Sequence, residues 1–77
     1  MDFIEGRDYV VHDADGRLLG SVIGDEFVRS VANKRLYRID GQEVYTLDTP
    51  AKLLGVVEGG RGVGLDGKVL FTLQLES

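Results

Sequence analysis

The residues best suited to chemistry lie together in the run His12-Asp13-Ala14-Asp15-Gly16. His12 is the only histidine, so a pair of histidines for metal binding or proton shuttling is excluded. Two aspartates before a glycine resemble part of a calcium loop, but the full loop needs further oxygen ligands and a terminal glutamate. One basic and two apolar residues follow instead. We therefore interpret the run as a turn in which aspartate caps its own backbone.

A second tempting pattern is the glycine-rich stretch Gly55 to Gly67, which contains Gly59-Gly60-Arg61-Gly62-Val63-Gly64. A phosphate loop needs a Gly-Lys-Ser/Thr signature or a following helix N-terminus, and the sequence predicts neither. The serines Ser21, Ser30 and Ser77 do not occupy a nucleophile elbow. We predict no catalytic residue, no cofactor site and no metal site.

The aromatic residues are the remaining candidates for a binding face. A row of aromatic rings on a sheet can bind a sugar or a peptide, but aromatic residues at strand spacing more often fill the core. We expect core positions for most of them: Phe3, Tyr9, Phe27, Tyr37, Tyr45 and Phe71.

Length and charge limit the class of protein. A chain of 77 residues is a single domain, 1–77, and buries a small core. It has no cysteine to cross-link it, so we expect a homo-oligomer in a reducing, cytoplasmic compartment. The net charge of −4 argues against nucleic-acid binding and against attachment to an anionic membrane. The N-terminus does not have the apolar segment of a signal peptide.

Turn signals divide the chain at intervals of about 7–10 residues, which is typical of an all-β sandwich or barrel. The segments between turns are rich in β-branched and aromatic residues. We predict a meander of about eight antiparallel strands, closed or nearly closed as a flower or small barrel. Their predicted ranges are 8–14, 17–23, 26–32, 35–39, 42–47, 51–57, 61–65 and 68–75. Residues 25–34 are predicted as a strand, with a short helix as the alternative.

Two-residue turns predict the register of three hairpins. A turn at Asp40-Gly41 places Arg38 opposite Glu43 and Leu36 opposite Tyr45. A turn at Gly59-Gly60 pairs Glu58 with Arg61 and Val56 with Val63. A turn at Asp66-Gly67 places Gly64 opposite Val69 and Gly62 opposite Phe71. A three-residue turn with a bulge at glycine is the competing geometry, and it shifts these pairs.

The dipeptide Asp-Gly occurs three times, at Asp15, Asp40 and Asp66, at intervals of 25 and 26 residues. Asp-Gly between apolar runs is a strong hairpin signal, and its recurrence predicts a repeated unit. We predict repeats over 15–39 and 40–65 with a partial third copy over 66–75. A turn near the middle of each repeat divides it into hairpins of about a dozen residues, so we expect four hairpins.

Short hairpins of this kind, followed by Leu-Gly and an apolar pair, resemble the bacterial four-fold β-flower proteins. The matching stretches are 36–45, 52–60 and 63–70. The resemblance implies a small all-β fold of four hairpin petals and implies no activity. The stretch from Tyr9 to Val22 is also similar to the opening hairpin of PRC-barrel domains, which are small six-stranded barrels in ribosome-maturation and photosynthetic proteins.

Three functions follow as expectations. The first is a non-catalytic binding or interaction module that forms a homo-oligomer. The second is a PRC-type adaptor that docks on a larger protein. The third is a small enzyme whose site forms between subunits and uses His12 with Asp13 or Asp15.

Overall fold

The computed structural model describes residues 2–76, so Ser77 lies outside the described residues. Eight antiparallel strands follow one another in chain order and close into a barrel, because β8 pairs with β1. The predicted all-β meander is therefore confirmed, and it is closed. The strands are β1 (Asp8–Asp13), β2 (Leu18–Ile23), β3 (Phe27–Ser30), β4 (Arg35–Asp40), β5 (Glu43–Tyr45), β6 (Leu53–Glu58), β7 (Arg61–Gly64) and β8 (Val69–Leu75).

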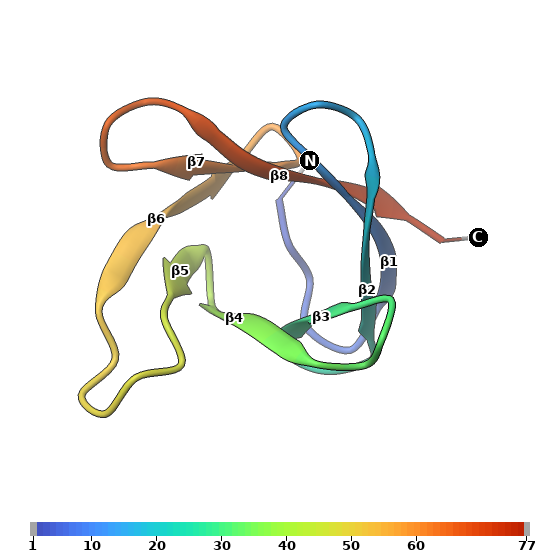
Figure 1. Ribbon diagram of the computed structural model, residues 1–77, viewed down its shortest axis with the longest axis horizontal. Coiled ribbons are helices and arrows are strands. Elements are labelled where there is room, and N and C mark those ends of the chain that lie inside the picture. The colour runs from blue at the N-terminus through green and yellow to red at the C-terminus, as the bar shows by residue number, and fades with distance from the viewer. Residues whose placement is uncertain (1, 77) are drawn as a thin grey trace.

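Consecutive strands form four hairpins, which we number 1 (β1–β2), 2 (β3–β4), 3 (β5–β6) and 4 (β7–β8). Figure 1 shows them around the centre of the molecule, each with its connecting loop at a corner. Residues 25–34 contain β3 and the loop that follows it. The predicted strand is therefore confirmed, and the alternative of a short helix is wrong. One bulge recurs at the same place in every hairpin, between Val11/His12, Val28/Arg29, Val44/Tyr45 and Gly62/Val63.

The structural unit is therefore a hairpin that recurs every 16 to 18 residues, as the spacing of these four bulges shows. The Asp-Gly interval is about one and a half such units. Asp15 and Asp66 lie in the loops of hairpins 1 and 4, whereas Asp40 ends β4 at the turn between hairpins 2 and 3. Since turns along a meander alternate between the two ends of a barrel, Asp40 lies at the end opposite to the other two.

Three of the hairpin loops share one geometry, the three-residue turn with a bulge. The loops start at Asp13, Ser30 and Gly64, and each has a positive φ at its fourth residue, 84° at Gly16, 64° at Asn33 and 85° at Gly67. The prediction that Gly64 lies opposite Val69 is therefore wrong, because the bulge pairs Val63 with Val69. The pairing of Gly62 with Phe71, beyond the bulge, is confirmed.

The turn between β4 and β5 also differs from the prediction. Asp40 pairs with Glu43 and Arg38 with Tyr45, so the predicted pairs Arg38–Glu43 and Leu36–Tyr45 are wrong by two residues. The physical reason is that Gly41 takes the first turn position, with φ 63°, as in a type II′ turn, and Asp40 stays in the strand. The Gly59-Gly60 turn has positive φ at both glycines, and its predicted pairs Glu58–Arg61 and Val56–Val63 are confirmed.

Each hairpin contributes to the core one inward-facing pair of residues next to its bulge, in addition to buried residues such as Tyr9, Ile39 and Leu73. The pairs are Val11–Gly20, Val28–Tyr37, Val44–Gly55 and Gly62–Phe71. Around the barrel, the even strands therefore alternate glycine, aromatic, glycine, aromatic. The Phe71 ring occupies the space that Gly62 leaves, and the half-buried Tyr37 ring lies beside it with its centroid 5.4 Å away. Alternating small and large residues in this way suits the narrow interior of a small barrel.

Gly20 and Gly55 also allow neighbouring hairpins to approach closely. A Cβ atom at Gly20 would overlap the backbone carbonyl oxygen of Arg29, and one at Gly55 would overlap that of Val63. Beyond these contacts, the Val31 N–H donates to the Leu19 carbonyl and the Leu65 N–H donates to the Leu54 carbonyl. Glycine is therefore required at the two corners where hairpin 2 crosses hairpin 1 and hairpin 4 crosses hairpin 3.

The N-terminal segment closes the end of the barrel that lies away from the viewer in Figure 1. Phe3 is buried and its ring lies 5.4 Å from that of Tyr9. The Gln42 side chain holds the Phe3 backbone at both ends, because Oε1 accepts from Phe3 N–H at 2.9 Å and Nε2 donates to the Phe3 carbonyl at 2.7 Å. The Ile4 N–H donates to the Tyr9 hydroxyl at 3.0 Å.

Replacing Gly55 with alanine should destabilise the barrel by about 3 kcal/mol, because the added methyl group has no space beside the Val63 carbonyl. Urea unfolding of Gly55→Ala against wild type measures this cost. Gly59→Asn is the matched control, since Asn-Gly suits the turn at Gly59-Gly60, and its change should stay within about 1 kcal/mol. Equal stability of both variants would contradict the close approach at Gly55.

Candidate functional site

The structure gives the aspartates of the His12–Gly16 run a structural role. The Asp13 Oδ1 atom accepts hydrogen bonds from the N–H groups of Asp15, at 2.9 Å, and of Arg17, at 3.0 Å. The predicted turn in which aspartate caps its own backbone is therefore confirmed. His12 is half-buried on β1, opposite Leu18 on one side and Thr72 on the other.

Two other hairpin loops are capped in the same way. The Ser30 Oγ atom accepts from Ala32 and Lys34, and the Thr46 Oγ1 atom accepts from Asp48 and Lys52. A polar residue at the end of the first strand, or directly after it in the case of Thr46, thus closes the loop of each of these hairpins. Residues 2–76 hold no group of three histidine, cysteine or carboxylate side chains placed to bind a metal ion.

The pKa of Tyr45 is shifted by its surroundings. The Tyr45 hydroxyl donates to Glu43 Oε1 at 3.0 Å, and this hydrogen bond is the main cause that raises the pKa of Tyr45 above its usual value. A tyrosine is protonated at neutral pH in any case, so the hydrogen bond is present there. Because the pKa is raised, the hydrogen bond is lost only at a higher pH than that at which an ordinary tyrosine loses its proton. Both residues lie on β5, on the outside of the barrel.

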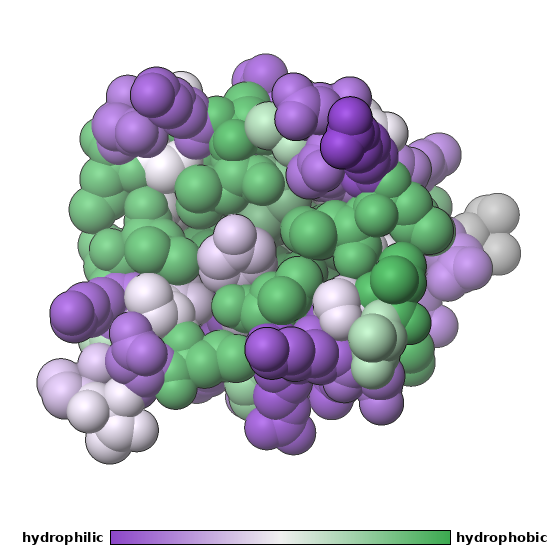
Figure 2. All heavy atoms as spheres, in the orientation of Figure 1, coloured by the Kyte–Doolittle hydropathy of each residue, from purple (hydrophilic) through white to green (hydrophobic). Residues whose placement is uncertain are grey.

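On the outside of the barrel, exposed apolar side chains indicate an interaction surface more clearly than these polar groups do. Figure 2 shows them across the middle of one face, with hydrophilic residues at its corners. Single exposed apolar residues are normal, whereas a contiguous set marks an interaction surface. The exposed large apolar residues are Ile4, Leu18, Ile23, Val31, Leu47, Leu53, Val56 and Leu65.

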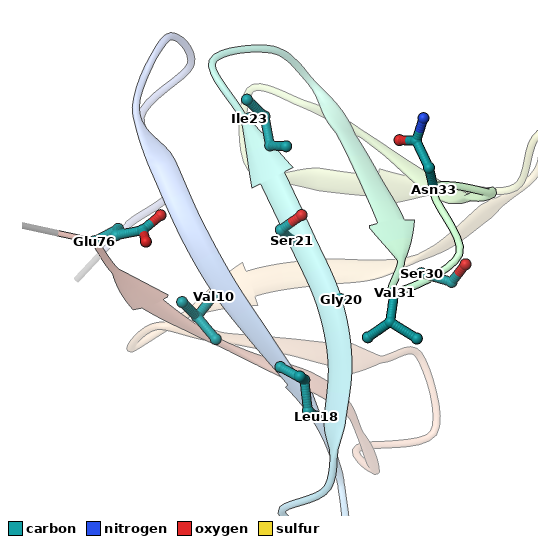
Figure 3. Close-up of a pocket in the computed structure, with 9 residues that line it drawn as sticks. All are labelled: Val10, Leu18, Gly20, Ser21, Ile23, Ser30, Val31, Asn33 and Glu76. Atoms are coloured by element: carbon teal, nitrogen blue, oxygen red, sulfur yellow. The ribbon is translucent and has the colours of Figure 1, made fainter.

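Three of these residues lie together in one groove of about 690 Å³ on the outer side of hairpin 1. We call it the hairpin-1 groove, and its lining residues are Val10, Leu18, Gly20, Ser21, Ile23, Ser30, Val31, Asn33 and Glu76. In Figure 3, β1 and β2 form its floor, while Glu76 and Asn33 lie on opposite sides. Val31 is on the loop of hairpin 2 and is 73% exposed.

The groove is broad and open to solvent, and its lining is mainly apolar. An enclosed pocket with converging polar groups is the usual site for a small molecule or a reaction. Here a single carboxylate, Glu76, is joined by two hydroxyl groups and one amide. The shape and lining therefore suit apolar side chains that another protein surface presents.

The repeat provides an internal comparison for this groove. Hairpin 3 has the same pairing as hairpin 1, so the groove residues on β1 and β2 have structural equivalents there. Leu18 corresponds to Leu53, which is also exposed, and Val31 corresponds to Leu65 in hairpin 4. Three other positions differ in kind: Val10 and Ile23 correspond to Glu43 and Glu58, and Ser21 corresponds to the exposed Val56. Hairpin 3 therefore has carboxylates at two outward positions where hairpin 1 has apolar side chains.

Sequence reasoning missed this groove. A signal for it was present in the true period of the repeat, which places leucine at the same position of all four hairpins, residues 19, 36, 54 and 70. Aligning the hairpins on these leucines brings Ile23 into line with Asp40, Glu58 and Gln74. An apolar residue at a position that is otherwise polar in the repeat points to this side of hairpin 1.

Comparison of the chain with protein-family models, with curated proteins and with solved structures found no match. Within residues 2–76, no helix has the length and apolar character needed to cross a membrane. The groove and the repeat are therefore the features of the molecule that bear on its function.

Replacing Asp13 with alanine should cost about 1 kcal/mol of unfolding free energy, because the loop of hairpin 1 loses both hydrogen bonds to the carboxylate. Asp13→Asn keeps an acceptor oxygen and should lose less. Asp48→Ala is the control, since its carboxylate accepts none of the hydrogen bonds found in residues 2–76. Urea unfolding compares the three, and a cost for Asp48→Ala equal to that for Asp13→Ala would contradict the role given to Asp13.

Proposed function

We propose that this chain is a non-catalytic protein-interaction module whose binding site is the hairpin-1 groove. The observation that carries the proposal is the contrast within the repeat: hairpin 1 has Val10 and Ile23 where hairpin 3 has Glu43 and Glu58. Both pairs of positions face outward, so the barrel core does not require apolar residues at either. An outward apolar surface costs solubility, and binding a partner is the benefit that offsets it.

The polar lining of the groove supports a protein partner. Ser21, Ser30 and Asn33 offer hydrogen-bonding groups beside the apolar residues Leu18 and Val31. A small apolar region with polar groups at its edge is the usual composition of a protein–protein contact. Because β1 is paired with both β2 and β8, the partner cannot add a strand there and has to bind through side chains.

The fold supports the wider resemblance as part of the same proposal. The resemblance to four-fold β-flower proteins implies four hairpin petals, and the four hairpins of this chain support it. The cytoplasmic location expected from the sequence also remains part of this proposal. The non-catalytic character is supported by Asp13, whose carboxylate is occupied by its own loop.

A neutral apolar dye, N-phenyl-1-naphthylamine, tests whether the groove binds apolar groups. Its fluorescence should rise on addition of the wild-type chain at a concentration too low for two copies to associate, and Leu18→Asp should remove most of this rise by placing a charge on the groove floor. Leu53→Asp, at the equivalent position of hairpin 3, is the matched control and should keep it. An equal response from both variants would contradict the proposed site.

A further inference from the structure

We infer that the hairpin-1 groove binds a second copy of this chain, with Val31 of each copy inserted into the groove of the other. This inference rests on the proposed function and names the partner. Val31 is the most exposed of the large apolar residues, at 73%, although its backbone is fixed by a hydrogen bond to Leu19. An apolar side chain that projects from an ordered loop beside a mainly apolar groove can insert into the same groove of another copy.

Val31 and the floor of the groove belong to adjacent hairpins. A dimer with one two-fold axis therefore contains the contact between Val31 and the groove twice. In a two-fold contact, residue i of one copy meets residue j of the other, and j meets i. Val31 of the first copy then enters the groove of the second between Leu18 and Ile23, which lie at the two ends of β2, and the same contact forms in reverse. Each copy covers three of its exposed apolar residues in this way.

Charge supports a second copy over an unrelated protein. Glu76 lies on one side of the groove, and Lys34 directly follows Asn33 on the other side. Rotation by 180° places the acidic side of one copy against the basic side of its partner. The three ion pairs found among residues 2–76 use Arg29 and Arg38 as their basic members, so neither Lys34 nor Glu76 takes part in them. The surface is therefore complementary to itself.

The contact between the two copies has to extend beyond the hairpin-1 groove to reach the usual size. The chain has 4753 Å² of accessible surface, and a stable complex usually buries about 800 Å² from each partner. Such a contact would use about one sixth of the surface. Among residues 2–76, ten apolar residues are buried in the core, so the contact adds appreciably to the apolar surface removed from water.

Analytical ultracentrifugation of the full chain at increasing concentration tests the inference. The wild type should sediment with twice the single-chain mass of 8.4 kDa. Val31→Asp should raise the dissociation constant of the dimer about 30-fold or more, because it places a charge at the centre of the contact. Leu65→Asp is the matched control, since Leu65 holds the equivalent loop position and is 71% exposed. It should change the constant less than about 3-fold.

Charge reversal tests the orientation of the two copies. Lys34→Glu and Glu76→Lys should each weaken the dimer about 3- to 10-fold, and the double variant should regain the loss. A wild type with single-chain mass at every concentration would overturn the inference, as would a dimer that Val31→Asp leaves intact. If the chain is monomeric but Leu18→Asp still removes dye binding, the second-copy inference fails and the proposed function stands. If dye binding is also unaffected, both fail.

Discussion

The closure of the barrel depends on the close approach of hairpins at Gly20 and Gly55. At these two corners the carbonyl oxygen of a bulge residue, Arg29 or Val63, occupies the space of a missing Cβ atom. The remaining interior is then small enough for the rings of Tyr37 and Phe71 to fill it. Short strands and a small core suffice because the backbone itself fills part of the interior.

This constraint also gives the outer surface its shape. Where hairpin 2 crosses hairpin 1 at Gly20, its loop is held beside β2 by the hydrogen bond from Val31 to Leu19. The loop becomes one side of the hairpin-1 groove, and Gly20 lies in the groove lining. The crossing at Gly55 is built in the same way, but Glu43 and Glu58 interrupt the apolar surface there. One architectural feature thus occurs twice, and only at hairpin 1 are these two positions apolar.

The all-β fold and the number of strands could be predicted from turn signals, because glycine and aspartate between β-branched residues restrict the backbone locally. Registers were harder, since Asp-Gly suits both a two-residue turn and a three-residue turn with a bulge. The turn at Gly41 has two residues, whereas the turn that ends at Gly67 has three residues and a bulge, so the local sequence alone does not distinguish the two. The groove could not be predicted from local patterns, because it joins hairpin 1, the loop at Val31 and Glu76 near the chain end. The capping role of Asp13 could be predicted, since it is local.

The central claim is that the hairpin-1 groove is an interaction site and that the equivalent surface at hairpin 3 is not. Amide chemical shifts measured by NMR as the protein concentration rises test this claim most directly. The account predicts shifts at Leu18, Ile23 and Val31 and little change at Leu53, Glu58 and Leu65, which are their equivalents in the repeat. Shifts of equal size at both sets of residues, or shifts confined to hairpins 3 and 4, would contradict it.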